Sequence, residues 1–163
     1  MSNVVNLKQS LFPLVEAFFT EEEFNPQQHE DEPVFVMFVR GENARWRCFA
    51  EVNENQHRFR FLSVLDVEVP EDKRAKMAEF ITRANYGLPA ATFEMDFSDG
   101  ELRCRSSLDL TDVRATKVMI RNVVYPNLLA LDLYYTGLMG VLYSDETPEA
   151  LIAKVEGESA ESV

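Results

Sequence analysis

Residues 90–110 alternate between apolar and polar side chains on both sides of an Asp-Gly pair, and this pattern predicts a β-hairpin. A period of two places the apolar residues on one face of the strand pair. That face comprises Phe93, Met95, Phe97, Leu102 and Cys104. Asp99 and Gly100 form the predicted two-residue turn, because glycine accepts a positive φ and aspartate tolerates one. All five apolar side chains are expected to be buried beneath helices.

A two-residue turn also fixes the pairing of the two strands. In the resulting register Asp96 faces Arg103 and Glu94 faces Arg105, so acid meets base twice on the polar face. Cross-strand pairs of this kind contribute about 0.2–1 kcal/mol each. The two carboxylates are therefore interpreted as members of ordinary ion pairs and not as a catalytic pair.

Three more strands are predicted earlier in the chain. Residues 34–39, VFVMFV, form a continuous apolar run, which indicates a strand buried on both faces. Residues 45–52 alternate, and residues 57–65 form the next strand after a turn. The expected core side of these two strands comprises Trp46, Cys48, Phe59 and Phe61.

Helical spacing of apolar residues predicts four helices. The helical segments are residues 5–21, 70–87, 114–143 and 148–155. Pro13 indicates either a kink in the first helix or a stable part that starts near Ser10. Thr111 or Asp112 can cap the third helix, and Pro126 indicates a kink within it.

The predicted order is α-β-β-β-α-β-β-α, followed by a short terminal helix. Strands joined by short turns form an antiparallel sheet, and helices bury their apolar stripes against it. We therefore expect an α+β fold with a five-stranded antiparallel sheet and helices packed on one face. A chain of 163 residues favours a single domain. We place this domain at residues 1–156, with a disordered acidic tail at 157–163.

The net charge of −12 is concentrated in two segments. Residues 21–32 contain six carboxylates and no lysine or arginine, and residues 145–163 contain six carboxylates and one lysine. The rest of the chain is close to neutral. Such a charge distribution disfavours non-specific binding to nucleic acid or to an anionic membrane, and it suits a basic partner or solubility.

No arrangement of residues predicts catalysis, a metal site or a cofactor, and we do not expect an enzyme. His29 and His57 lie far apart, and neither Cys48 nor Cys104 belongs to a pair with metal-ligand spacing. Both cysteines fall on apolar strand faces, which indicates buried thiols in a reducing compartment, with a disulfide between them as the alternative. The N-terminus lacks the pattern of a signal peptide, so we expect a cytoplasmic protein.

Residues 123–143 form the most apolar window, but an internal proline and aspartate and the lack of basic flanks argue against a membrane span. We interpret the segment as a buried helix with a second apolar stripe that packs on another subunit. The predicted homodimer interface comprises Leu129, Leu133, Thr136, Gly137 and Gly140. In the competing interpretation, the N-terminal helix covers this stripe with Leu11, Leu14 and Phe18.

Arginines and aromatic residues interleave on the two strands before residue 66. A two-residue loop between these strands places Glu51 opposite Arg58 and Phe49 opposite Arg60. Sheets that bind RNA carry such side chains, but the acidic chain repels phosphate, so nucleic acid is disfavoured. The candidate surface for a protein partner therefore comprises Arg47, Phe49, Arg58 and Arg60. The alternative is a small-ligand or RNA-binding regulator that uses the same face.

Three stretches together resemble the YbjN family. They are WRC at 46–48 with the strand leading to VPEDKR at 69–74, RANYGLP at 83–89 leading to FEMD at 93–96 and DGELR at 99–103, and residues 131–143. Their order and spacing over residues 40–155 carry the resemblance.

The resemblance implies a fold similar to that of class I type III secretion chaperones, with the same order of elements. Those chaperones are small, acidic, dimeric and non-enzymatic, and they bind unfolded segments of secreted proteins. YbjN-like proteins are linked to regulation and stress responses, and the family has no catalytic residues to transfer. The resemblance therefore implies a non-enzymatic protein-binding module, chaperone-like or regulatory, that acts as a homodimer without a cofactor.

Overall fold

The computed structural model describes residues 9–161 and confirms an α+β fold with an antiparallel sheet. The elements in chain order are α1 (Leu11–Glu21), β1 (Gln27–Gln28), β2 (Val34–Arg40), β3 (Arg45–Asn53), β4 (Arg58–Glu68), α2 (Glu71–Gly87), β5 (Thr92–Met95), β6 (Glu101–Asp109), α3 (Lys117–Tyr143) and α4 (Pro148–Glu161). The six strands have the spatial order β1-β2-β3-β4-β6-β5.

The prediction of five strands was wrong because it missed β1, which lies in the segment expected to be an acidic loop. Gln27 pairs with Val36 and Gln28 pairs with Phe35, at the edge of the sheet. Two exposed glutamines carry no alternating apolar pattern, so only their backbone pairing identifies them as a strand.

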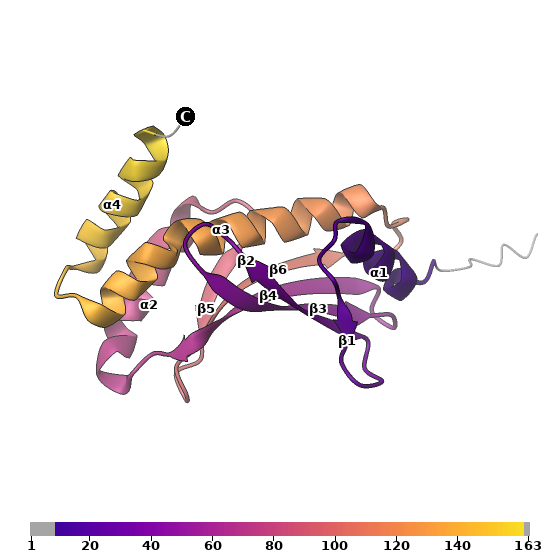
Figure 1. The fold of residues 1–163 in the computed structure, drawn as a ribbon, viewed down its shortest axis with the longest axis horizontal. Coiled ribbons are helices and arrows are strands. Elements are labelled where there is room, and N and C mark those ends of the chain that lie inside the picture. Colours follow the sequence, from indigo (N-terminus) through magenta and orange to yellow (C-terminus); the bar gives the residue numbers. More distant parts are fainter. Residues whose placement is uncertain (1–8, 162–163) are drawn as a thin grey trace, which may run out of the picture.

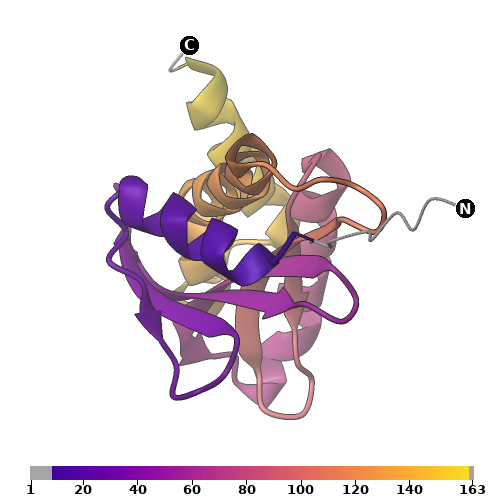
Figure 2. The same ribbon diagram turned by 90° about the vertical axis from the view of Figure 1, so that its right-hand side faces the viewer.

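The helices cover one face of the sheet. Helix α3 runs along this face, and α1 lies beside its N-terminal half (Figure 1). The view turned by 90° shows α1 and α3 together above the strands (Figure 2). Helix α2 packs against α3 and β5, and α4 packs against α2 and α3. No helix of residues 9–161 covers the opposite side of the sheet, which we call the open face.

The core lies between the sheet and the helices. The sheet contributes Phe35, Met37, Trp46, Cys48, Ala50, Val52, Phe59, Phe61, Leu65, Phe93, Leu102 and Cys104, all buried. Helix α1 adds Leu11, Val15, Phe18 and Phe19, and the ring of Phe19 stacks on that of Phe61 with their centroids 5.7 Å apart. The expected core side of β3 and β4 is therefore confirmed.

Strand β2 is not buried on both faces, contrary to the prediction. Phe35 and Met37 are buried beneath the helices, but Phe38 points to the other side and is 70% exposed. The side chains of β2 that point to the open face are less buried because no described helix covers that face. The continuous apolar run in the sequence does not reveal this difference.

The hairpin of β5 and β6 forms around a longer turn than predicted. Strand β5 ends before Asp96, whose N–H donates to the Glu101 carbonyl over 2.9 Å. The Asp96 carboxylate accepts the Ser98 N–H, and the Asp99 carboxylate accepts the Glu101 N–H. These side-chain bonds stabilise the turn locally. Gly100, with φ of 85°, completes it.

The longer turn shifts the predicted register by two residues. Glu94 lies opposite Arg103, where Asp96 was expected, and it also contacts Arg105 on the diagonal. Phe97 falls in the turn and is 61% exposed, so its predicted burial was wrong. A shift of two residues keeps each strand residue on its face, and Phe93, Leu102 and Cys104 are buried as expected.

Strands β3 and β4 show the same shift. A turn of four residues, 54–57, replaces the predicted two-residue loop. Glu51 therefore lies opposite Arg60 and not Arg58, and Phe49 lies opposite Leu62.

The helix boundaries correct several predictions. Helix α1 begins at Leu11 after Ser10, as one alternative had it, and the predicted part before residue 9 lies outside the described residues. Thr116 caps α3, with its side chain accepting the Met119 N–H, so neither Thr111 nor Asp112 does so. Helix α4 continues to Glu161, so residues 157–161 of the expected disordered tail are helical, and residues 162–163 lie outside the described part.

A buried asparagine fixes α3 to the sheet. Asn127 follows the internal Pro126 and is fully buried. Its Oδ1 accepts the Ser63 hydroxyl over 2.6 Å, and its Nδ2 donates to the Cys104 carbonyl over 3.0 Å and to Ser106 Oγ over 3.2 Å. Because a buried amide without partners is costly, this network specifies how α3 lies on β4 and β6.

A second contact joins α3 to the turn between β2 and β3. The Asp132 carboxylate accepts the N–H groups of Glu42 and Asn43 over 3.0 and 2.9 Å. Gly41 is required beside it, because a Cβ at that position would lie 2.2 Å from Asp132 Oδ1. Asp132 therefore acts as a structural residue of the β2–β3 turn.

Candidate protein-binding surface

The open face carries the side chains that alternate with the core residues, most of them polar or aromatic and a few aliphatic. On β2 and β3 these are Val34, Val36, Phe38, Arg40, Arg45, Arg47, Phe49 and Glu51, and on β4, β6 and β5 they are Arg58, Arg60, Leu62, Val64, Arg103, Arg105, Ser107 and Glu94. The face is thus rich in arginine, although the chain as a whole is strongly acidic.

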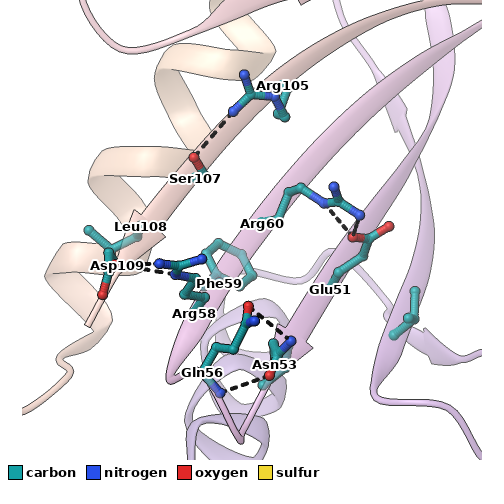
Figure 3. A pocket seen from close by; sticks show the side chains of 12 residues that line it. Glu51, Asn53, Gln56, Arg58, Phe59, Arg60, Arg105, Ser107, Leu108 and Asp109 are labelled. Carbon is teal, nitrogen blue, oxygen red and sulfur yellow. Dashed lines mark hydrogen bonds and ion pairs between the residues drawn. The ribbon is translucent and has the colours of Figure 1, made fainter. Parts of the chain in front are cut away.

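One end of the open face is hollowed. The hollow has a volume of about 670 Å³ and lies over β3, β4 and β6 (Figure 3). Ion pairs join Arg60 to Glu51 and Arg58 to Asp109, the latter over 3.1 Å. Hydrogen bonds from Thr111, and then the guanidinium of Arg58, hold the pKa of Asp109 below its usual value. Arg105, which also lines the hollow, is paired with Glu94, so all three arginines of the hollow already have a carboxylate partner.

The far side of the open face has a similar network. Glu94 lies between Arg103, at 3.0 Å, and Arg105. Partial burial raises the pKa of Glu94, but hydrogen bonds from Arg105 and Arg103 outweigh this effect and hold the pKa below its usual value. Arg105 also donates to Ser107 Oγ over 3.3 Å. These groups form a compensated surface and not a set of catalytic acids and bases.

The four residues predicted to bind a partner, Arg47, Phe49, Arg58 and Arg60, all lie on the open face. The structure divides them into two pairs. Arg58 and Arg60 are held by acids, whereas Arg47 lies over the ring of Phe49 at 5.5 Å from its centroid and forms no ion pair with any described residue.

Sequence reasoning missed two residues of this face, Phe38 and Arg40. Phe38 lies directly opposite Arg47, and Arg40 lies opposite Arg45. The alternation in burial along β2 is not visible in the sequence, because residues 34–39 are all apolar.

The predicted dimer residues are also divided. Leu129, Leu133 and Thr136 are exposed on α3, with 67% of Leu129 and 39% of Leu133 accessible, and we call these three the outer α3 surface. Gly137 and Gly140 instead face α2 and α4, because a Cβ on either would lie 2.5 Å from Phe80 or Leu151. The two glycines therefore allow close packing within the chain.

Helix α1 does not cover the outer α3 surface. Leu11 and Phe18 point into the core, and Leu14 is partly buried against it. The end of α1 contacts α3 further toward its N-terminus, where Glu22 accepts hydrogen bonds from Arg121 and Tyr125. A hollow of about 680 Å³ lies there, lined by Glu22, Arg121, Asn122, Tyr125, Pro126 and Leu129.

The two cysteines are buried and free. Ser63 on β4 lies opposite both Cys48 and Cys104, so the cysteines are two strand spacings apart, about 9.6 Å. A disulfide needs Cα atoms within about 7 Å. Burial raises the pKa of each thiol to about 12, which leaves no reactive thiolate.

Across residues 9–161, no three His, Cys, Asp or Glu side chains are arranged to hold a metal ion. None of the described helices is both long and apolar enough to cross a membrane.

The sequence profile of the YbjN family, described as a putative bacterial sensory transduction regulator, matches residues 13–138. The chain belongs to the YbjN family. The match begins in α1, spans the whole sheet and ends in α3, so it includes the open face and the outer α3 surface. No curated protein matches the sequence.

Solved structures share this YbjN-family fold at low sequence identity. YbjN from E. coli matches with a TM-score of 0.57 and 10% identity, covering 90% of this chain and 92% of that one. The ExsC–ExsE complex matches with a TM-score of 0.57 and 11% identity, over 81% and 96% of the two chains. The HopA1–SchA chaperone–effector complex matches with a TM-score of 0.51 and 13% identity, over 73% and 89%. The predicted likeness to type III secretion chaperones is thus confirmed for the fold.

Proposed function

We propose that this YbjN-family chain is a non-enzymatic protein-binding module with a chaperone-like or regulatory role. The observation that carries the proposal is the open face, where exposed aromatic and arginine side chains lie together and no described helix covers them. Aromatic residues and arginine dominate the binding energy of protein interfaces. The ExsC–ExsE and HopA1–SchA structures, which share the fold, are complexes with protein partners and support this assignment.

The proposal is tested by selection from a random peptide library against the immobilised full chain. Enrichment of peptides that bind the purified protein is the expected result, and these peptides should lose affinity when Arg47 or Phe49 is replaced. Native mass spectrometry of the purified protein provides a second test. A metabolite, metal ion or nucleotide retained at one equivalent per chain would contradict a protein-binding role.

A homodimer through the outer α3 surface is the second part of the proposal. Leu129 and Leu133 expose apolar side chains on the same side of α3, beside a hollow, and a second copy of the surface would cover them symmetrically. Light scattering at micromolar concentration should give about twice the chain mass of 18.7 kDa.

The variant with Leu129→Glu and Leu133→Glu tests the location of this interface. It should give a monomer, whereas Val113→Glu, another exposed apolar position, should leave the dimer intact. A wild-type mass of 18.7 kDa would contradict the dimer.

The alternative function is a small-ligand or RNA-binding regulator that uses the same face, favoured by the hollow and its arginines. It predicts a mobility shift of single-stranded RNA at low salt that weakens with salt and with Arg47→Gln or Arg60→Gln. Absence of a shift at about 50 mM salt would exclude RNA, because phosphate contacts are strongest there.

A further inference from the structure

Three arginines without acidic partners lie together at one end of the open face. Arg40 on β2 is directly opposite Arg45 on β3, and Arg47 follows two residues later on the same face of β3. No carboxylate of the described residues lies within 4 Å of these guanidinium groups, although Arg58, Arg60, Arg83, Arg103, Arg105 and Arg121 all form ion pairs. Asp66 on the neighbouring strand makes no ion pair with them.

This arrangement opposes folding locally. Like charges directly opposite each other on a sheet destabilise it, and the chain has 28 acidic residues from which a partner for Arg40 and Arg45 could have been drawn. Departures from such local rules are expected at functional sites. The uncompensated charge therefore points to a ligand that supplies the missing carboxylates.

Two aromatic side chains lie within the same group. Phe38 is 70% exposed and lies opposite Arg47, and Phe49 lies beneath the guanidinium of Arg47. We call Phe38, Arg40, Arg45, Arg47 and Phe49 the arginine patch. It offers apolar contact area beside charged hydrogen-bond donors, a combination that suits an anionic segment with an apolar side chain.

We propose that the arginine patch binds an acidic segment of a partner protein in an extended conformation. Arg45 and Arg47 are two residues apart on one strand, about 6.8 Å, and alternate side chains of an extended segment repeat at the same distance. The segment therefore carries carboxylates at alternate positions and an aromatic or large apolar side chain beside them. This inference rests on the proposed protein-binding function and specifies the chemistry of its partner.

The surroundings of the patch favour a short acidic segment over a nucleic acid. Beyond the patch, the arginines of the open face are already paired, Arg60 with Glu51 and both Arg103 and Arg105 with Glu94, and the whole chain carries −12. A polyphosphate chain that ran beyond the three arginines would meet only arginines that already have a carboxylate partner, on a protein of strongly negative net charge. A segment with two or three carboxylates matches the patch and ends within it.

Fluorescence anisotropy with two labelled peptides tests the proposal. The first probe has glutamates at alternate positions around one phenylalanine, and the second has lysines in place of the glutamates. The first should bind, with an affinity that falls by about tenfold or more between about 50 mM and about 500 mM salt, because the contacts are exposed and screened. The lysine peptide should not bind the wild-type chain.

Matched variants locate the site. Arg45→Gln and Arg47→Gln should each weaken the glutamate peptide about tenfold, as expected for loss of one charge-assisted contact. Arg83→Gln changes the net charge equally but removes an arginine on α2, away from the open face and already paired with Glu79, so its effect should stay within about twofold. The double variant Arg45→Glu with Arg47→Glu should bind the lysine peptide instead.

Three results would overturn the inference. They are absence of peptide binding at low salt, an equal loss of affinity with Arg83→Gln, or binding of single-stranded RNA through Arg45 and Arg47 when the glutamate peptide does not bind. A library selection that yields peptides weakened by Phe49→Ala but insensitive to Arg45→Gln and Arg47→Gln would refute this inference alone. A selection that yields no binding peptide would refute the proposed function itself.

Discussion

Replacing Asn127 by leucine is expected to lower the free energy of unfolding by about 2–4 kcal/mol. Leucine has a similar size, so little cavity forms, and the loss comes from the polar network. The Ser63 hydroxyl would lose its acceptor at 2.6 Å and keep only the weakly accepting Cys48 Sγ at 3.4 Å. An unsatisfied buried polar group costs about 1–3 kcal/mol. The bonds from Nδ2 to the Cys104 carbonyl and to Ser106 would also be lost.

A double-mutant cycle measures this network directly. Ser63→Ala alone should cost about 1–3 kcal/mol, because Asn127 Oδ1 then lacks a donor. Adding Ser63→Ala to Asn127→Leu should cost nothing further or recover stability, so that the coupling energy is at least about 1 kcal/mol. Urea unfolding followed by circular dichroism gives these values, with the m-value as a check that the unfolding transition is unchanged.

The exposed Asn122, on the same helix, provides the control. Asn122→Leu should change stability by no more than about 0.5 kcal/mol. Equal stability of Asn127→Leu and wild type, or additive single effects, would refute the view that this amide fixes α3 on the sheet.

Three further predictions follow from the register, the ion pairs and the thiols. Phe97→Ala should cost less than about 1 kcal/mol in urea unfolding, whereas Phe93→Ala should cost about 3–5 kcal/mol; similar costs would contradict the turn. Glu94→Gln should destabilise the chain near pH 7, and the difference from wild type should shrink as pH falls through the lowered pKa of Glu94, because only its ionised form is stabilised by the arginines; a difference independent of pH would contradict this. Cys48 and Cys104 should resist a thiol reagent in the native protein and react together on unfolding, and fast native labelling would show that they are accessible.

Much of the fold follows from the period-two pattern, because a register error of two residues preserves the faces. Both hairpins were predicted with turns two residues too short, yet Phe59, Phe61, Phe93 and Leu102 were assigned to the correct side. The length of the β5–β6 turn was not predicted, because side-chain hydrogen bonds stabilise the longer turn. Asp96 and Asp99 accept backbone N–H groups, and this chemistry competes with the two-residue Asp-Gly turn.

The candidate surface was only partly predictable, because its residues depend on the faces and the register of the strands. Arg47 and Phe49 were found because arginine and aromatic residues visibly alternate on β3, whereas Phe38 lies within an apolar run and Arg40 directly follows it. The cross-strand register decides which arginines have an acidic partner. The shift by two residues places Glu51 opposite Arg60, where the two form an ion pair. Gly137 and Gly140 could not be assigned from the α3 sequence alone, since their close neighbours are side chains of α2 and α4.

Asp132 gives the two proposed binding surfaces a shared residue. It lies on α3 next to Leu133, and its carboxylate holds the N–H groups of Glu42 and Asn43, in the turn that leads from Arg40 to Arg45. A displacement of α3 on dimer formation must therefore carry this turn along or break these two hydrogen bonds. Self-association and peptide affinity would then be thermodynamically linked, and a peptide that binds the dimer more tightly must strengthen the dimer by the same factor per site.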